Sequence, residues 1–166
     1  GYGAVSGVLT KKNYADGIKQ HFGSIPHSVT HQGFSLGVAA AVAAQKIISQ
    51  PDFLESVRYK SELLKSLLID GLTESNFVRD VRGRGLRLSL EYNCSDQHLF
   101  GVSLANRLKD NHGIIISGKW HRISFSPALT INPDEIRMVI NRVCSEFLKL
   151  ENEWPTISKD NILNQA

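Results

Sequence analysis

The residues with the clearest chemical potential lie in a short turn that runs into an alanine-rich helix. The stretch from Val29 to Ile48, VTHQGFSLGVAAAVAAQKII, begins with polar residues and becomes almost wholly apolar after Gly33. The first N–H groups of a helix have no partner inside the helix, so they are suited to donate to an anion. The hydroxyl of Thr30 would add one more donor. The same residue types also cap helices, so the sequence leaves open whether Thr30 and Ser35 are caps instead.

Other chemically capable residues give weaker signals. His21, His27 and His31 are of a metal-ligand type, but a loop separates them and no Cys or carboxylate completes a set, so we expect no metal. Arg82 and Arg84 flank a glycine turn, where isolated arginines are usually structural. The formal charge of +3 is too small to favour nucleic acid, and we expect no nucleic-acid partner.

Composition predicts an ordinary globular protein. At 166 residues, with 42% hydrophobic and 21% charged residues, the chain suits one sizeable domain or slightly more. The alanine-rich helix is shorter than a membrane span and contains Gln45 and Lys46, so we expect no membrane partner. Cys94 and Cys144 lie far apart and form no C-x-x-C motif, which favours a reduced, cytoplasmic protein; a disulfide between them stays open.

Three helices are expected to position the turn and its surroundings. Apolar residues at helical spacing predict a helix over about 11–22, and a loop over 23–32 then leads to the alanine-rich helix. We expect that helix to be buried on most sides, because it has no polar stripe. Pro51 should break or kink it, and a further helix should run to about Leu72.

From Phe77 the pattern changes from helical to alternating, which indicates a subdomain boundary near residues 75–76. Strands, a helix ending at Gly113, two more strands and a final helix follow, so we expect a small α+β domain whose mostly antiparallel sheet is covered by two helices. Asn132, Pro133 and Glu135 form a capping box that opens the final helix, and a polar tail is expected after about residue 150. The expected ranges are 80–85 for a short strand and a tight glycine turn, 86–92 for a strand, 97–111 for a helix, 114–116 and 122–126 for strands, and 133 to about 150 for a helix.

Four segments of the chain resemble, in the right order, the C-terminal half of the class III pyridoxal-phosphate-dependent aminotransferases of fold type I. Each segment alone is weak, and their order is what makes the resemblance specific. It extends from Gly1 to about Leu150. The segments are GY at 1–2 with SGVL at 6–9, THQGFSLGVAAA at 30–41, DVRGRGLRLSLE at 80–91, and ISFSPALTI at 123–131 followed by an acidic helix start at 134–135.

The resemblance implies an α/β architecture and a division of the chain. Residues 1–50 are expected to be the end of the large cofactor-binding domain and the start of the interdomain helices. Residues 51–76 would be an interdomain helix, 77–150 the small C-terminal α+β domain, and 151–166 the polar tail. The glycine-rich start of the chain reads as the inside of a domain, so we expect further chain before Gly1.

The resemblance also assigns roles to individual residues. Thr30 matches a threonine that binds the coenzyme phosphate of the neighbouring subunit, and Gln32 and Gly33 would help through their backbone. Tyr2 would lie near the wall of the active site, with packing against the lysine loop as the alternative. The catalytic lysine is expected upstream of Gly1, so this polypeptide alone should be inactive.

Departures from the family pattern concern the substrate. In the acetylornithine and 4-aminobutyrate branches an arginine that holds a substrate carboxylate usually sits where Ser124 stands. Its absence favours the ω-amino-acid or amine branches, and Lys119 or Arg122 could supply a carboxylate clamp from nearby. The remaining departures are Ala4, His31, Phe34, Ser35 and Ala128.

The resulting hypothesis is an aminotransferase that moves an amino group from an amino acid or amine to a keto acid or aldehyde by a two-step ping-pong mechanism. It would need pyridoxal 5'-phosphate, the N-terminal half of the same enzyme, and a homodimer with shared active sites. Two alternatives stay open, namely an aminomutase and a non-catalytic aminotransferase-like partner subunit. A lysine a few positions before Gly1 would favour the enzyme.

Overall fold

The computed structural model describes residues 3–160, with side chains through Trp154. The chain forms two compact units, unit 1 at Gly1–Leu54 and unit 2 at Glu55–Ala166. In the part of the chain that the structure describes, no helix has an apolar stretch long enough to cross a membrane.

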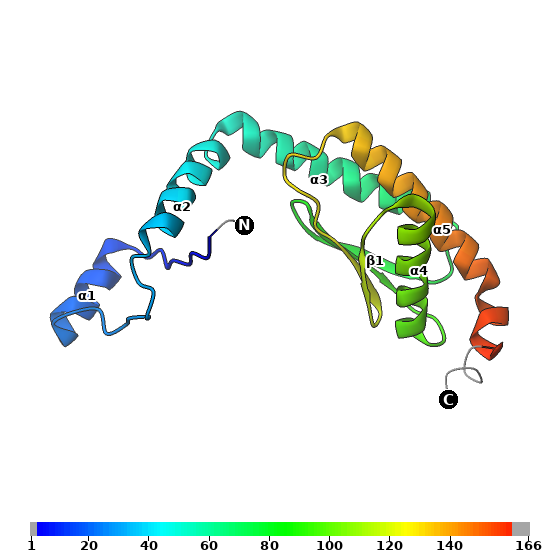
Figure 1. Ribbon diagram of the computed structural model, residues 1–166, viewed down its shortest axis with the longest axis horizontal. Helices are drawn as coiled ribbons and strands as arrows, with labels where there is room; N and C mark the ends of the chain where they lie inside the picture. Colours follow the sequence, from blue (N-terminus) through cyan, green and yellow to red (C-terminus); the bar gives the residue numbers. More distant parts are fainter. Residues whose placement is uncertain (1–2, 161–166) are drawn as a thin grey trace. The chain divides into compact units, whose positions relative to one another are not determined.

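Unit 1 consists of two helices joined by a loop (Figure 1). Helix α1 (Lys12–Phe22) ends at Gly23, which adopts a φ of +76° and donates its N–H to the carbonyl of Lys19 at 2.8 Å. Helix α2 (Ser35–Ile48) is the alanine-rich helix expected from the sequence. Helix α3 (Pro51–Gly71) begins at the predicted proline and continues into unit 2.

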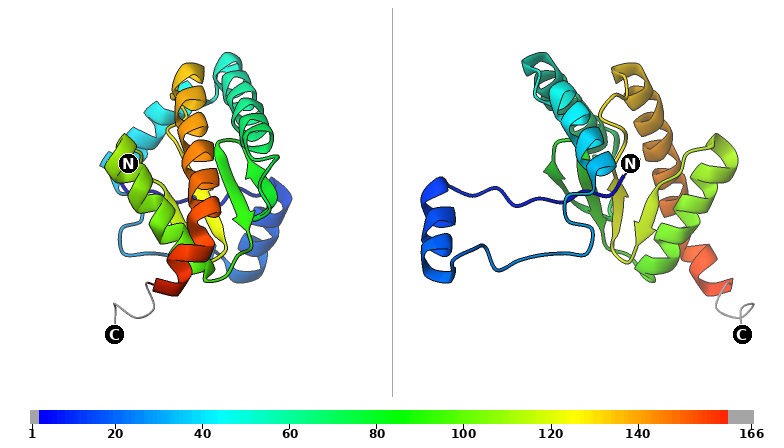
Figure 2. Two further views of the ribbon diagram at one scale, coloured as in Figure 1. Left: turned by 90° about the vertical axis from the view of Figure 1, so that its right-hand side faces the viewer. Right: turned by 60° about the vertical axis from the view of Figure 1, so that its left-hand side comes forward.

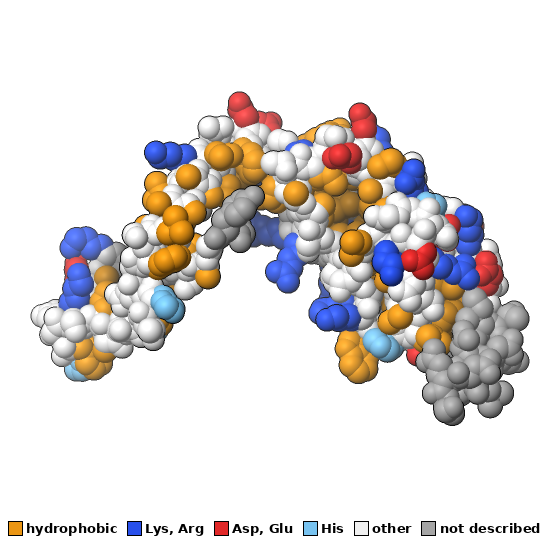
Figure 3. Space-filling model, viewed as in Figure 1, with side chains coloured by type: hydrophobic (Ala, Val, Ile, Leu, Met, Phe, Trp, Pro, Cys, Tyr) orange, Lys and Arg blue, Asp and Glu red, His pale blue; other side chains and the backbone are white. Residues whose placement is uncertain are grey.

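Helix α2 is not buried as the sequence led us to expect. Gly37 is the single buried residue among residues 3–54, and Leu36 and Val42 are 68% and 51% exposed. Hydrophobic side chains are visible along α2 in Figure 3. The described part of unit 1 has no strand, so it lacks the broad apolar surface against which such a helix would pack.

Unit 2 contains, after α3, the α+β arrangement with an antiparallel sheet that the sequence predicted from the change of pattern at Phe77. Its four strands pair in the order β1-β2-β4-β3, and every pair is antiparallel. The order strand, strand, helix, strand, strand, helix is as expected. The elements after α3 are β1 (Val78–Arg84), β2 (Arg87–Tyr92), α4 (Gln97–His112), β3 (Ser117–Lys119), β4 (Arg122–Phe125) and α5 (Pro133–Asp160).

One face of the sheet forms the core of unit 2. Leu88, Leu90 and Tyr92 alternate inward on β2, and Leu90 pairs with the inward Ile123 of β4. Helices α3, α4 and α5 all contribute buried side chains to this core and lie over the sheet (Figure 2, left), whereas the sequence indicated two covering helices. The additional helix is α3, whose Leu64 and Leu68 join the core, and Leu72 joins it just after the helix ends.

The last helix begins as predicted and ends later. Asn132 Oδ1 accepts the N–H of Glu135 at 2.8 Å, and Glu135 Oε2 accepts the N–H of Asn132 at 3.0 Å, which is the expected capping box. The prediction that the helix ends near Leu150 is wrong, because α5 runs to Asp160. The extension buries Trp154, which is 1% exposed and donates its indole N–H to the Ser95 carbonyl at 2.7 Å.

The predicted strand at residues 114–116 is also wrong. The N–H of Ile114 donates to the Leu108 carbonyl at 3.1 Å, so this backbone helps to end α4 instead of joining the sheet. Extending the observed pairing of Ser117 with Ser124 would also place Ile114 opposite Pro127, which has no N–H to donate. A largely apolar pocket of about 140 Å³ lies beside this segment.

The backbone of the β3–β4 hairpin packs directly against the backbone of α4. A Cβ on Gly118 would lie 2.3 Å from the Gly101 carbonyl oxygen, so β3 and α4 can approach this closely only with glycine at 118. Tyr92 Oη lies 2.7 Å from the carbonyl of Gln97 at the start of α4 and 2.8 Å from that of Trp120 in the hairpin turn. Burial raises the pKa of Tyr92 above its usual range, so the hydroxyl stays protonated and can donate.

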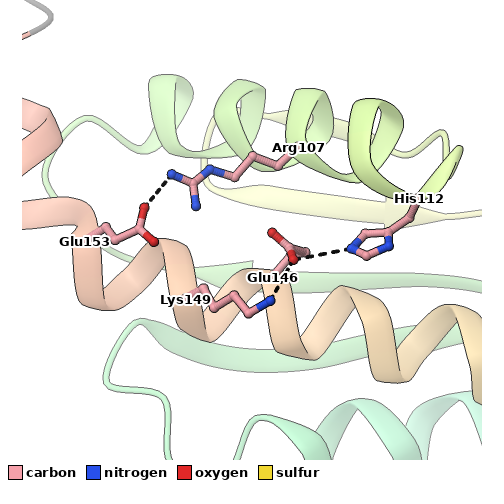
Figure 4. Close-up of polar contacts among 5 residues, drawn as sticks. All are labelled: Arg107, His112, Glu146, Lys149 and Glu153. Atoms are coloured by element: carbon pink, nitrogen blue, oxygen red, sulfur yellow. Dashed lines mark hydrogen bonds and ion pairs between the residues drawn. The ribbon is translucent and has the colours of Figure 1, made fainter.

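Helices α4 and α5 are also joined by ion pairs (Figure 4). Glu146 of α5 is buried, and its Oε1 lies 3.1 Å from Lys149 Nζ and 3.3 Å from His112 Nε2 of α4. Burial by itself would raise the pKa of Glu146, but the hydrogen bonds from Lys149 and His112 outweigh it and the pKa is lowered. A second pair joins Arg107 to Glu153.

Replacing Gly118 with alanine should destabilise unit 2. The added methyl group meets the backbone of α4, which cannot rotate away as a side chain could, so we expect a loss of about 1–3 kcal/mol or more. Chemical denaturation of the whole chain, followed by circular dichroism, measures the loss. The control is Gly17→Ala, where a Cβ meets nothing within 4 Å and the transition of unit 2 should not move.

Acid should weaken unit 2 through Glu146. Its pKa is lower in the folded state than the ordinary value of 4.5, so the unfolded chain binds more protons in acid. The contribution is therefore complete above the ordinary carboxyl pKa and is lost as the pH falls through the folded value. Glu146→Gln should flatten this part of a curve of unfolding free energy against pH. An equally steep fall in wild type and variant would contradict the prediction.

Candidate functional site

The first candidate site is the turn before α2. The N–H of Gln32 donates to the Val29 carbonyl at 2.9 Å, and the N–H of Phe34 donates to the His31 carbonyl at 3.2 Å. Gly33 adopts a φ of +74°, which a side chain would disfavour. These two hydrogen bonds and the glycine set the direction in which the chain enters the helix.

The donors of this turn suit an anion. Among the described residues, the backbone N–H groups of Thr30, His31 and Gly33 and the Thr30 hydroxyl donate to no other residue. Thr30 is exposed, and no acidic residue occupies the first turn of α2. The positive end of the helix dipole is therefore not neutralised by the chain nearby. A phosphate group fits this set of donors.

The capping alternative for Thr30 and Ser35 is not what the structure shows. Phe34 is the N-cap of α2 and makes no side-chain cap hydrogen bond, and Ser35 is already the first helical residue. The segment near the start of the chain also borders the first turn, because a Cβ on Gly37 would lie 3.1 Å from the Ala4 carbonyl oxygen. Tyr2, the neighbouring residue predicted to contact substrate, lies outside the described residues.

The second candidate site is the β3–β4 hairpin of unit 2. Lys119 and Arg122 are paired across the two strands and flank a two-residue turn made by Trp120 and His121. Ile123 points into the core, so Arg122 lies on the outer face of the sheet, and both cations are exposed. The structure thus brings the two predicted substrate-binding residues of this unit together.

Ser124 shares the outer face with Arg122 on β4. It is half-buried, and its strand partners are Ser89 of β2 and Ser117 of β3. A row of three serines therefore crosses the sheet next to the two cations. Because Ser124 carries no charge, the cations on the outer face of this hairpin are Lys119 and Arg122.

Several features of the hairpin could not be read from the sequence. The turn has no Gly, Asn or Asp, the residues that usually mark a two-residue hairpin, and Trp120 itself adopts a positive φ of 54°. The three isoleucines at 114–116 suggested a strand there, whereas β3 begins at Ser117. The sequence therefore could not predict that Ser117 pairs with Ser124. The close approach of Gly101 and Gly118 joins residues too distant in sequence for any local pattern to reveal.

The cysteines and histidines add no further site in the described residues. Burial raises the pKa of Cys94 and of Cys144 to about 11, so neither thiol is a ready nucleophile at neutral pH. Both cysteines are free. No group of three or more His, Cys, Asp or Glu side chains gathers in a metal-binding arrangement within residues 3–154.

Comparison with known proteins identifies a family for most of the chain. A family model described as aminotransferase class-III matches residues 4–146. An aminotransferase of Gibberella zeae is 33% identical over 163 residues, which cover 86% of this chain and 31% of the relative. The acetylornithine aminotransferase of Bacillus subtilis is 29% identical over 139 residues, or 84% of this chain and 34% of the relative. The chain thus spans about a third of the length of these relatives.

Solved structures share the fold. The ω transaminase of Pseudomonas jessenii, solved in complex with PMP, superposes with a TM-score of 0.70 at 24% identity, covering 84% of this chain and 32% of the other. An aminotransferase of Bacillus anthracis gives a TM-score of 0.70 at 23% identity, covering 84% and 34%. At these identities the likeness speaks for the fold, and it confirms the fold type I architecture expected from the sequence.

Proposed function

This chain belongs to the class-III aminotransferase family, and on that premise we propose that it is the C-terminal part of a pyridoxal-phosphate-dependent aminotransferase. The enzyme moves an amino group from an amino acid or amine to a keto acid or aldehyde in a two-step ping-pong reaction. The observation that carries the proposal is the match of the family over residues 4–146, joined to an anion-suited turn at the position the family uses for phosphate.

Thr30 is proposed to hold the phosphate of the coenzyme through its hydroxyl and its backbone N–H. Gln32 and Gly33 contribute by bringing backbone close to the phosphate, and the start of α2 adds the positive end of its dipole. What supports these roles is the set of unpaired donors at Thr30 and Gly33 and the absence of an acid in the first turn of α2. When bound, pyridoxal phosphate supplies an electron sink for the amino group of the substrate.

The proposed enzyme needs parts that lie outside this chain. A lysine that holds the coenzyme and moves the substrate proton is assigned to the N-terminal half of the same enzyme. We place Thr30 against the coenzyme of the neighbouring subunit in a cytoplasmic homodimer. The exposed apolar side chains of α2 support such an assembly, because contiguous apolar surface of this kind usually meets a partner.

Lys119 and Arg122 are proposed to bind the carboxylate of a small-molecule substrate. Their support is their shared place on the outer face of the β3–β4 hairpin, where Ser124 leaves room. Tyr2 is proposed to contribute to the wall of the active site. The amino donor and the acceptor are thus both expected to be small molecules.

Spectroscopy of the assembled enzyme tests the proposed function. The assembly contains this chain and the family segment that supplies the lysine, and it is mixed with pyridoxal phosphate. We expect a visible absorption band of bound coenzyme that disappears on adding an amino donor and returns on adding a keto acid. A folded sample that shows no band would defeat the proposal, and a band that no donor changes would argue against amino transfer.

Thr30→Ala should weaken coenzyme binding much more than it weakens the fold. Losing a charge-assisted hydrogen bond to a phosphate should raise the dissociation constant of the coenzyme about tenfold or more. The hydroxyl makes no hydrogen bond to another described residue, so the melting temperature of the apoprotein should hardly change. Equilibrium dialysis and calorimetry measure the two effects.

The matched control is Thr30→Ser, which keeps the hydroxyl and should keep most of the affinity. Equal losses of affinity and of thermal stability in Thr30→Ala would instead indicate a structural role for Thr30.

A further inference from the structure

A pocket lies in unit 2 where the pairing of β3 with β4 stops. The last pair is Ser117 with Ser124, and the same register would next set residues 114–116 opposite residues 125–127. Pro127 has no N–H to donate, so the ladder does not continue. Both of these three-residue segments line one pocket of about 140 Å³, which we call the ladder-end pocket. The pocket is therefore the space left between two segments that do not pair.

The floor of the ladder-end pocket belongs to the core of unit 2. Leu64 of α3 and Ile136 and Ile140 of α5 line it, and they are only 3%, 1% and 1% exposed. Ile131 and Val139, which also line it, are half-buried and form part of its rim. The pocket thus combines a floor fixed by close packing with a rim that reaches solvent, so a ligand can enter without opening the core.

The lining sets the chemical class of the ligand. In the part of the chain with described side chains, no charged residue lines the pocket, and its polar side chains are those of Ser124 and Ser126. A charged group placed there would lose its hydration without gaining a counter-charge. Water would find few hydrogen-bond partners among the isoleucines. The pocket therefore suits an uncharged and mainly apolar group.

The volume of the pocket sets the size of the ligand. An apolar cavity of about 150 Å³ lined by aliphatic and aromatic side chains stays dry and takes up benzene. Side chains that border empty space lack contact atoms on one side, and a ligand of matching size restores those contacts. A single aromatic ring with a small substituent fits these requirements.

We propose that the ladder-end pocket is a binding site for a small uncharged apolar molecule. The ligand class is a single-ring aromatic or branched aliphatic compound of about six to eight non-hydrogen atoms. The site lies within unit 2 and uses neither Thr30 nor the cations Lys119 and Arg122. Binding requires neither coenzyme nor turnover, so it stands apart from the proposed aminotransferase reaction.

Toluene is the probe, and methyl NMR of the isoleucines of the whole chain locates its binding. The aromatic ring should shift the signals of Ile136 and Ile140 saturably, with a dissociation constant of about 1 mM or lower. Two isoleucines that do not line the pocket are internal controls, namely Ile123 in the core and Ile69, which is 48% exposed. Shifts that do not saturate, or that are equal at the control positions, would overturn the proposal.

Filling the pocket from its rim should remove the binding. Val139→Phe places a ring in the space that toluene would occupy, so the dissociation constant of toluene should rise about tenfold or more. The matched control is Val102→Phe, the same change at an exposed position of α4 that does not line the pocket, and it should leave the affinity unchanged. Circular dichroism checks the fold of both variants, and the titration of the unmodified chain decides the proposal if Val139→Phe does not fold. Unchanged affinity in folded Val139→Phe would contradict the assigned location.

A charged analogue tests the assigned ligand class. Benzoate keeps the ring of toluene and carries a carboxylate in place of the methyl group. Because no charged residue of the described chain lines the pocket, benzoate should bind about tenfold more weakly or worse. Binding of benzoate as tight as that of toluene, with the same methyl signals shifted, would overturn the assignment to apolar ligands.

Discussion

The backbone contact between Gly101 of α4 and Gly118 of β3 is the constraint on which the arrangement of unit 2 depends. A Cβ on Gly118 would lie 2.3 Å from the Gly101 carbonyl oxygen, so the helix and the hairpin can approach this closely only with glycine at 118, and a Cβ on Gly101 would lie 2.5 Å from Tyr92 Oη. Tyr92 continues the same contact by reaching the carbonyls of Gln97 and Trp120. The outward direction of Lys119 and Arg122 follows, because the inner side of their hairpin is already fixed on α4.

The two units differ in how much of their apolar surface is buried within the described chain. Unit 2 closes around a continuous core in which Phe100 touches Phe77, Tyr92, Phe147 and Trp154 at centroid distances of 5.0–5.5 Å. Unit 1 buries only Gly37 among residues 3–54, so its helices are held mainly by their own hydrogen bonds. Most of the stability of a helix in a protein comes from burying one of its faces. The apolar face of α2 is therefore a surface from which unit 1 can gain stability only by contact with further protein.

Local patterns predicted the elements well, and long-range contacts account for what they missed. The capping box at Asn132 and the alternation from Leu86 to Tyr92 depend on neighbours in sequence, and the structure confirms both. The end of α5 was misplaced because Trp154 is stabilised by Ser95, 59 residues away. At the candidate sites, the sequence singled out Thr30 and the two hairpin cations, and their roles stay predictions. It could not find the serine row, because that row exists only through strand register.

The two candidate sites share one physical feature, namely hydrogen-bond donors or cations that face solvent without an acidic partner in the described chain. Each presents donors that the described part of the chain leaves without acidic partners: backbone N–H groups at the start of α2, and Lys119 and Arg122 beside two serine hydroxyls on the outer face of the β3–β4 hairpin. Leaving such groups unpaired brings no gain in folding stability, and the like-charged pair of Lys119 and Arg122 lowers it. Positive potential that is already oriented toward solvent is useful for holding anions, because no rearrangement is needed when the anion binds. An anion bound at either candidate site would therefore stabilise the chain, because it would pair donors that have no acidic partner in the described chain.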